Sequence, residues 1–192
     1  MERVSVFIDG ENFCYGIKSI NKFYTDFRFN FERYINYITK GKKLIDVYYF
    51  IAPLKQNLNP IIYTKQQKLF NRLKKVGYKI ILCKRRKRDS EEGKEFHKIK
   101  EDDIRLALQM QKDAYENKFD TAFLFSGDGD FVPLPEFLKE KGKKVNVVYF
   151  EDSISISLFR ACNFKGFKIN KKILNKFFLR EKSSLNKTKV SL

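Results

Sequence analysis

The chain has 192 residues, of which 43% are hydrophobic, and this is enough for one domain with a substantial core. Its 40 Lys and Arg residues outnumber 23 Asp and Glu residues, and the net charge of +17 favours nucleic acid over an anionic membrane surface as a partner. No apolar run reaches the roughly 20 residues of a membrane span. Since no cleavable signal segment is recognised either, we expect a cytoplasmic protein with no membrane partner.

Cysteine and histidine are too few for several common kinds of site. Cys14, Cys83 and Cys162 lack any Cys-x-x-Cys spacing, which argues against a disulfide framework and against a zinc knuckle. A Ser-His-Asp or Cys-His centre would have to use the single histidine, His97, which we interpret as a structural or surface residue. We therefore expect buried, reduced cysteines and a chemistry that depends on carboxylates.

Apolar runs and helical patterns alternate along the chain. Five β-rich runs predict strands buried on both faces, at residues 4–9, 44–52, 79–84, 121–127 and 144–150. The patterns between them predict helices at residues 31–40, 60–76, 103–118 and 131–142. This alternation is typical of βαβ units. We therefore predict an α/β fold in which helices cover both sides of a mostly parallel sheet of about five strands.

Two of the helical segments carry further information. The helix predicted at 103–118 has one broad apolar face, formed by Ile104, Ala107, Leu108 and Tyr115. The C-terminal segment 171–192 is more basic and polar than the domain predicted at residues 1–170. We expect this segment to begin as a basic helix through Leu179 and to continue as a flexible tail.

Acidic residues gather where the predicted strands end. Asp9 ends the first strand, Asp128 and Asp130 follow the strand at 121–127, and Asp103 begins the next long helix along the chain. In an open parallel sheet these positions share the carboxyl edge, where ligands bind. Two carboxylates about 4 Å apart repel by about 4 kcal/mol at an effective dielectric constant near 20, and a divalent cation relieves that repulsion. Mg²⁺ or Mn²⁺ suits such a site, because hard ions prefer carboxylate oxygen and water.

Each of these acids also has a purely structural explanation. Asp130 could cap the helix at 131–142, Asp128 and Asp9 could serve turns, and Asp103 could favour a helix N-terminus. All four are nevertheless expected at one edge of the sheet. We therefore interpret Asp9, Asp103, Asp128 and Asp130 together as a metal site.

Three segments of the chain resemble, in their sequence and in their order, the segments of one protein family. VFIDGENF (6–13), KEDDIRLALQM (100–110) and DTAFLFSGDGDFVPLPEFLKEKGKKV (120–145) together resemble the NYN domain, a branch of the PIN-like nuclease superfamily. The resemblance covers about residues 4–150, and it implies a compact PIN-like α/β/α sandwich and metal-dependent RNA cleavage. It implies a catalytic set that combines the metal ligands with a polar partner: Asp9, Asn12, Asp103, Asp128 and Asp130. Ser126 would lie beside the last two acids.

The chain departs from the family pattern at two places. It has Lys100-Glu101-Asp102-Asp103 where many relatives have Lys-Gly-Val-Asp, so Asp102 could change the register of the ligand. Relatives also often carry an acid near Gln109, and the amide here weakens the case for two metals. We expect Asp102 and Gln109, like Ser126, to support the ligands rather than to bind the ion directly.

A basic segment precedes the helix that carries Asp103. We interpret residues 83–100 as a loop at the rim of the site, where its cations would guide a phosphate backbone; they are Lys84, Arg85, Arg86, Lys87, Arg88, Lys98 and Lys100. A solvated, self-paired charged loop is the alternative. On the resemblance alone, single-stranded or structured RNA is the expected partner. The sequence leaves the oligomeric state open, including a homodimer.

These observations leave two main hypotheses. The first is a ribonuclease that hydrolyses phosphodiester bonds through the aspartate cluster, Mg²⁺ or Mn²⁺ and a metal-activated water. The second is a non-catalytic RNA-binding or adaptor module on the same fold. A phosphatase of small esters ranks third, because the chain lacks an Asp-x-Asp-x-Thr run that would supply a nucleophile.

Overall fold

The computed structural model of the chain describes residues 1–22, 25–88 and 96–179, and for 85–88 and 96–100 it describes the backbone alone. The tail predicted at 180–192 lies outside the described residues. Within them, no helix is long and apolar enough to cross a bilayer.

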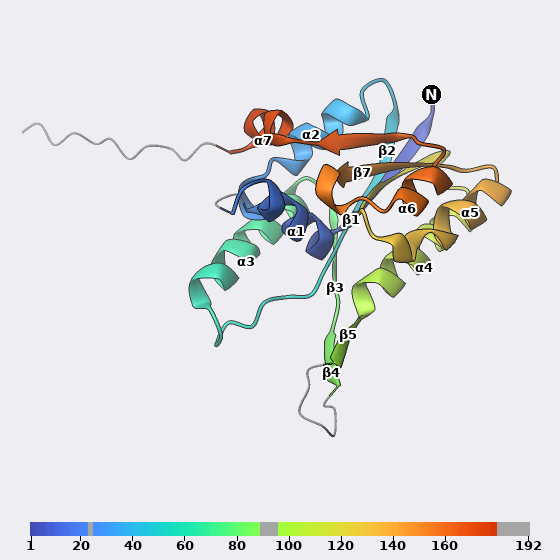
Figure 1. The fold of residues 1–192 in the computed structure, drawn as a ribbon. Coiled ribbons are helices and arrows are strands. Elements are labelled where there is room, and N and C mark those ends of the chain that lie inside the picture. The colour runs from blue at the N-terminus through green and yellow to red at the C-terminus, as the bar shows by residue number, and fades with distance from the viewer. Residues whose placement is uncertain (23–24, 89–95, 180–192) are drawn as a thin grey trace, which may run out of the picture.

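Six parallel strands form the central sheet, in the order β3-β2-β1-β6-β7-β8 (Figure 1). The prediction of a mostly parallel sheet is confirmed, and its five strands correspond to β1 (Arg3–Asp9), β2 (Lys43–Ile51), β3 (Lys79–Leu82), β6 (Thr121–Phe125) and β7 (Lys144–Phe150). The sixth strand, β8 (Gly166–Ile169), was not predicted. It has four residues of which only Ile169 is buried, so it lacks the long apolar run by which the other strands are recognised.

Helices cover both faces of the sheet, as the alternation of strands and helices predicts. One face packs against α1 (Gly10–Ile20), α2 (Phe31–Ile38), α3 (Pro60–Lys75) and α7 (Lys171–Phe177), and the other against α4 (Glu101–Tyr115), α5 (Pro133–Glu140) and α6 (Ile156–Ala161). Within β1, Val4, Val6 and Ile8 belong to the first core and Phe7 to the second, because side chains alternate along a strand. Three short 3₁₀ helices complete the elements: η1 (Asp26–Arg28), η2 (Gly129–Phe131) and η3 (Glu151–Ser153).

The apolar face identified on the helix at 103–118 is largely exposed. Ile104, Leu108 and Tyr115 are 54%, 59% and 66% exposed. The buried stripe of α4 consists instead of Asp102, Leu106, Met110, Asp113 and Ala114. Two of these buried residues, Asp102 and Asp113, are acidic. A search for the most hydrophobic face of the helix therefore selected the exposed face instead.

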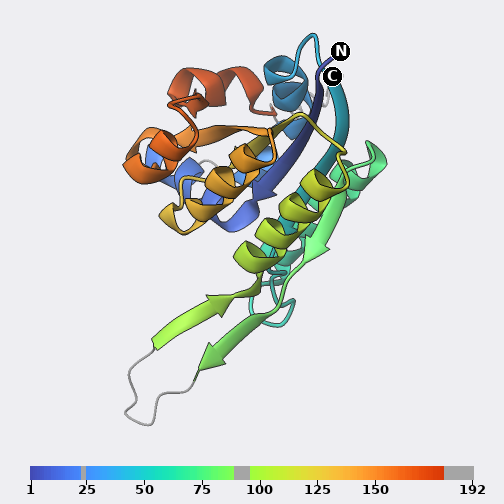
Figure 2. The ribbon, with the colours of Figure 1, turned by 90° about the vertical axis from the view of Figure 1, so that its right-hand side faces the viewer.

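The segment interpreted as a loop at 83–100 contains a β-hairpin. Strands β4 (Arg85–Arg88) and β5 (Phe96–Lys100) pair antiparallel, with Arg85 opposite Lys100 and Arg88 opposite Phe96. In Figures 1 and 2 this hairpin projects away from the body of the domain. Because β4 follows β3 and β5 leads directly into α4, the base of the hairpin lies at the carboxyl edge of the sheet.

Candidate metal centre

The sheet changes its direction of winding between β1 and β6. From β1 the chain continues to β2 on one side, and from β6 it continues to β7 on the other. The two connections therefore diverge at the carboxyl edge, and open α/β sheets bind ligands in the crevice at such a switch point. Asp9 is the last residue of β1 and Ser126 directly follows β6, so both lie at this crevice.

The carboxylate of Asp9 is buried and joins the two diverging connections. Its Oδ1 accepts a hydrogen bond from the backbone N–H of Asn12 at 2.9 Å and caps α1, while its Oδ2 accepts one from Ser126 Oγ at 3.1 Å. Burial raises the pKa of Asp9 to about 7 although these hydrogen bonds lower it, and the charges of Asp103 and Asp102 raise it further. Asp9 is therefore a carboxyl group whose ionised form needs a compensating positive charge.

Three carboxylates converge at this edge. One oxygen each from Asp9, Asp102 and Asp103 lies within 4.8 Å of the others, and Asp102 is only 3% exposed. Both α4 residues lie in the first turn, where the helix dipole favours negative charge. Ligands about 2.1 Å from a Mg²⁺ ion are at most about 4.2 Å apart, so small side-chain rotations would bring this group to the geometry of such an ion. A set of carboxylate oxygens is also the donor chemistry that Mg²⁺ and Mn²⁺ prefer.

Asp128 and Asp130 lie on the loop after β6 but are not part of this three-carboxylate group. Asp128 Oδ1 accepts a hydrogen bond from the backbone N–H of Asp130 at 3.0 Å and caps η2, which is the turn role that was its alternative explanation. Asp130 is exposed, and no side-chain hydrogen bond caps the following helix α5. Metal ligation by these two aspartates stays a prediction.

Asn12 links the same two connections through its side chain. Its Oδ1 accepts a hydrogen bond from the backbone N–H of Gly127 at 3.1 Å. Gly127 is tightly confined, since a Cβ atom there would lie 2.0 Å from the carbonyl oxygen of Ser153. Ser126 Oγ in turn accepts from the Asp128 N–H at 3.2 Å. Asn12 and Ser126 therefore connect the residues after β1 with the loop after β6. The supporting role of Ser126 toward metal ligands stays a prediction.

The sequence matches the model of a known family along most of its length. The family model described as the NYN domain matches residues 3–169. The chain belongs to the NYN domain family. This family is a branch of the PIN-like superfamily, whose nucleases typically use divalent metals.

A solved structure supports the fold of this NYN domain. A protein of unknown function from Vibrio parahaemolyticus superposes with a TM-score of 0.70 over 93% of this chain and 96% of that chain, at 21% sequence identity. At this identity the likeness shows the fold alone. No curated protein matches the sequence.

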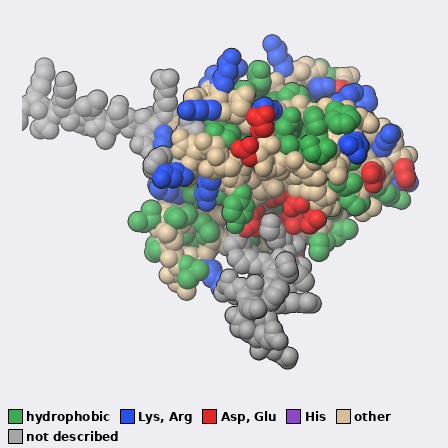
Figure 3. Space-filling model, in the orientation of Figure 1, with side chains coloured by type: hydrophobic (Ala, Val, Ile, Leu, Met, Phe, Trp, Pro, Cys, Tyr) green, Lys and Arg blue, Asp and Glu red, His purple; other side chains and the backbone are tan. Residues whose placement is uncertain are grey.

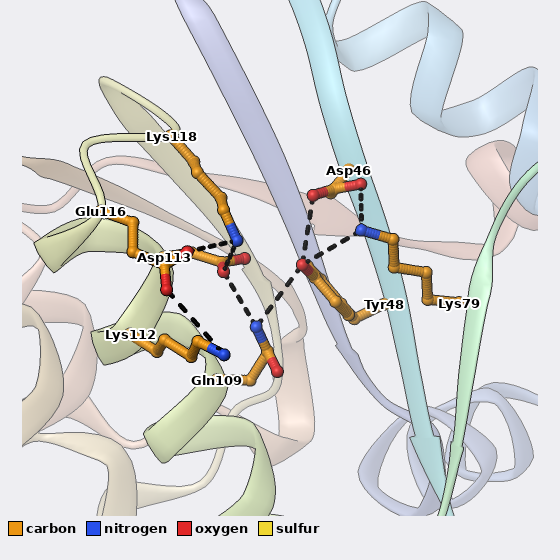
Figure 4. Close-up of polar contacts among 8 residues, drawn as sticks. All are labelled: Asp46, Tyr48, Lys79, Gln109, Lys112, Asp113, Glu116 and Lys118. Atoms are coloured by element: carbon orange, nitrogen blue, oxygen red, sulfur yellow. Dashed lines mark hydrogen bonds and ion pairs between the residues drawn. The ribbon is translucent and has the colours of Figure 1, made fainter.

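Gln109 belongs to a second polar cluster of the NYN domain, midway along α4 (Figure 4). Its Nε2 donates to Asp113 Oδ1 at 2.9 Å and to the hydroxyl of Tyr48 at 3.5 Å. Lys118 Nζ also donates to Asp113 Oδ1, at 2.9 Å, and Asp113 is fully buried. Gln109 lies about 9 Å along the helix axis from Asp103. These contacts give Gln109 a partner other than the three carboxylates, and sequence reasoning missed Asp113.

The hairpin brings a basic sequence to the same edge of the NYN domain. Lys84 is exposed, and its backbone N–H donates to Glu101 Oε2 at 2.8 Å, which ties the base of the hairpin to the start of α4. The side chains of the other predicted RNA-binding residues, in 85–88 and at Lys98 and Lys100, lie outside the described part. Figure 3 shows acidic side chains gathered where the hairpin joins the body of the domain. RNA binding by the hairpin stays a prediction.

Proposed function

We propose that this NYN domain is a Mg²⁺- or Mn²⁺-dependent ribonuclease that hydrolyses phosphodiester bonds of RNA. The observation that carries the proposal is the convergence of Asp9, Asp102 and Asp103 at the carboxyl edge of the sheet. Family membership supports nuclease chemistry, and the net charge of +17 supports a polyanionic substrate. The choice of RNA over DNA follows the family resemblance.

Asp9, Asp102 and Asp103 would hold the ion. When bound, a divalent ion supplies Lewis-acid polarisation of the scissile phosphate and lowers the pKa of water. Asp9 must lose its proton to serve as a ligand, and its raised pKa places that step near neutral pH. Ser126 and the Asn12 N–H keep both Asp9 oxygens oriented while the carboxylate is ionised.

The remaining residues around the crevice would position the substrate. Asp128 and Asp130 follow Ser126 on the same loop, so we retain them as groups that approach the ion or the water that attacks phosphorus. The basic hairpin leads directly into α4, and we propose that it attracts the phosphate backbone toward the three carboxylates. A non-catalytic RNA-binding module is the competing proposal, since it would keep this basic hairpin without cleaving RNA.

The test compares cleavage and binding in the same variants. Asp102→Asn and Asp103→Asn should each abolish Mn²⁺-stimulated cleavage of end-labelled RNA, while binding measured in EDTA stays equal or becomes tighter. Asp152→Asn is a matched control, because this exposed acid on η3 lies outside the three-carboxylate group. Asp128→Asn, measured alongside, decides whether the loop after β6 contributes a ligand.

Two results would contradict the ribonuclease. If the wild-type protein binds RNA but cleaves neither single-stranded nor structured RNA with either ion, the binding-module proposal replaces it. If the Asp102→Asn and Asp103→Asn variants cleave as fast as Asp152→Asn, the three carboxylates are not the centre. Parallel assays on DNA and on a small chromogenic phosphate ester determine the substrate class.

A further inference from the structure

A second candidate site lies on the other face of the sheet from α4. A pocket of about 470 Å³ opens between η1, α3 and the segment after α7; it is lined by Thr25, Phe27, Arg28, Lys65, Lys68, Leu69, Arg72 and Leu179. This volume is within the range of small-ligand pockets. Four of the eight lining residues are cations and none is an acid, so the pocket is suited to an anion.

The cations come from two elements and converge. Lys65, Lys68 and Arg72 are spaced i, i+3 and i+7, which places them on one face of α3, and Arg28 ends η1. Lys65 and Lys68 are exposed, and no described carboxylate forms an ion pair with either of them. Their charge is therefore available to a ligand.

The two arginines are held in place by the protein. Arg72 Nη2 and Nη1 donate to the carbonyl oxygens of Phe29 at 2.7 Å and Phe27 at 3.3 Å, and its Nε lies 3.1 Å from Glu32 Oε1. Its side chain remains 27% exposed. An ordered guanidinium loses little conformational entropy when it binds an anion.

Arg28 is anchored in a similar way. Its Nη2 donates to the carbonyl oxygen of Leu179 at 3.0 Å, and its guanidinium carbon lies 5.1 Å from the centre of the Phe178 ring. The pocket thus has one anchored guanidinium group from η1, one from α3, and two exposed ammonium groups on α3.

A second basic pocket shows what these arginines add. It measures about 260 Å³ at the opposite edge of the sheet, and its cations are all lysines: Lys139, Lys143, Lys144 and Lys165. It contains no anchored guanidinium among its lining residues. A basic pocket is thus expected in a chain of this charge, whereas the two anchored arginines distinguish the pocket at α3.

The position of the pocket relates it to the metal centre. α3 follows β2, so it begins at the carboxyl edge of the sheet, and Figure 1 shows its first turn on the same side of the domain as the hairpin. Lys65 lies five residues after Pro60, which is about 8 Å along the helix from that edge. A strand that leaves the three carboxylates over this edge would next meet α3.

We propose that the pocket at α3 binds phosphate groups of the RNA strand away from the cleavage position. Arg28 and Arg72 present guanidinium groups to phosphate oxygens, and Lys65 and Lys68 add charge from the rim. The identification of the strand as RNA depends on the proposed function, while the phosphate chemistry depends only on the pocket. The pocket extends the substrate footprint from the hairpin to α3.

The experiment compares two charge reversals of equal size. Lys65→Glu/Lys68→Glu changes the pocket at α3, and Lys139→Glu/Lys165→Glu makes the same change in net charge at the second basic pocket. Binding of fluorescently labelled single-stranded RNA is measured by anisotropy in EDTA, between about 50 and 200 mM salt. We expect the α3 variant to bind about tenfold more weakly than the control variant, with a salt slope smaller by about two.

The outcomes separate this inference from the ribonuclease proposal. Equal weakening in both variants would overturn the pocket, because net charge alone would then explain binding. Selective weakening in EDTA supports it even if the protein cleaves nothing, and in a cleaving protein the α3 variant should also raise KM. Calorimetry with inorganic pyrophosphate is the last arm. One result would overturn the RNA assignment: the wild-type protein binds pyrophosphate, the α3 variant does not, and both variants bind RNA equally well. The pocket would then be assigned to small phosphate compounds.

Discussion

Two buried carboxylates of this domain differ in how the protein compensates their negative charge. Asp113, a fully buried residue of α4, accepts hydrogen bonds from the ammonium group of Lys118 and from the amide of Gln109, both at 2.9 Å. Asp9, 2% exposed, accepts from a backbone N–H and a serine hydroxyl, which are neutral donors. An ion pair compensates the charge of Asp113 inside the protein, whereas Asp9 needs a proton or an added cation.

This difference separates a carboxylate that is paired within the protein from one that belongs to the proposed metal centre. The pKa of Lys118 is raised by hydrogen bonds to Glu116 and Asp113, so its ammonium group stays charged at physiological pH. The pKa of Asp9 is raised toward neutrality by burial and by neighbouring acids, so its charge depends on what enters the crevice. The following changes test whether the charges of Asp9 and Asp113 are compensated in these different ways.

Asp9→Asn should have the largest effect. We expect it to reduce Mn²⁺-dependent RNA cleavage by about 1,000-fold, because the ion's contribution is several kcal/mol and each 1.4 kcal/mol is about tenfold. The variant should remain folded, since the amide oxygen can still accept the hydrogen bond from Asn12. Initial rates with labelled RNA and a thermal melt at about pH 8 check both parts. Wild-type cleavage by this variant would remove Asp9 from the centre.

The pH dependence of stability should follow Asp9. Its pKa rises from 3.8 in the unfolded chain to about 7 in the folded protein, so the folded state binds the proton more tightly. Without metal, the free energy of unfolding should therefore fall by about 3 kcal/mol from this group as the pH rises from about 4 to about 7.

Urea unfolding in EDTA across this range measures the slope, and Asp9→Asn should flatten it. Mn²⁺ competes with the proton for Asp9, so the ion should raise the melting temperature more at about pH 8 than at about pH 5.5. An equal shift at both pH values would show that Asp9 does not hold the ion.

Lys118→Met tests the second cluster. Removing the cation leaves Asp113 buried with the Gln109 amide, and because Lys118 is about a third exposed we expect a loss of about 1–2 kcal/mol in unfolding free energy. Lys112→Met is the control, since Lys112 lies 3.8 Å from Glu116 on the exposed side of α4 and should change stability by less than about 0.5 kcal/mol. Equal losses in urea unfolding would mean that burial of Asp113 carries no special cost.

Asn12→Ala should have a smaller effect on stability than Lys118→Met. It removes the acceptor for the Gly127 N–H, and the loss of one partly buried hydrogen bond costs about 1 kcal/mol. The same change should weaken Mn²⁺ binding in a calorimetric titration, because the loop after β6 is then free to move from Asp9. Unchanged metal affinity with lower stability would restrict Asn12 to a structural role.

The local pattern of the chain was sufficient to predict most of the fold. Long apolar strands such as β1 and β6 are buried on both faces in a parallel sheet, so their composition identifies them. β8 was not predicted, because this short edge strand has only one buried residue and therefore no apolar run in its sequence. It forms by pairing with β7, which is a contact that local sequence does not show. The hairpin β4–β5 was not predicted, because its charged sequence is typical of a loop. Its strands are defined by pairing across the hairpin, which local composition does not show.

For the site, the sequence by itself determined that Asp9 ends a buried strand and that acids begin the helix at 101–103, because both follow from local composition. The tertiary structure alone decided which helix acid turns inward. Successive helical residues differ by about 100°, so the packing of Leu106 and Met110 on the sheet also buries Asp102, four residues before Leu106. Since the exposed stripe of Ile104 and Leu108 is equally apolar, only the contact with the sheet could choose between the two faces.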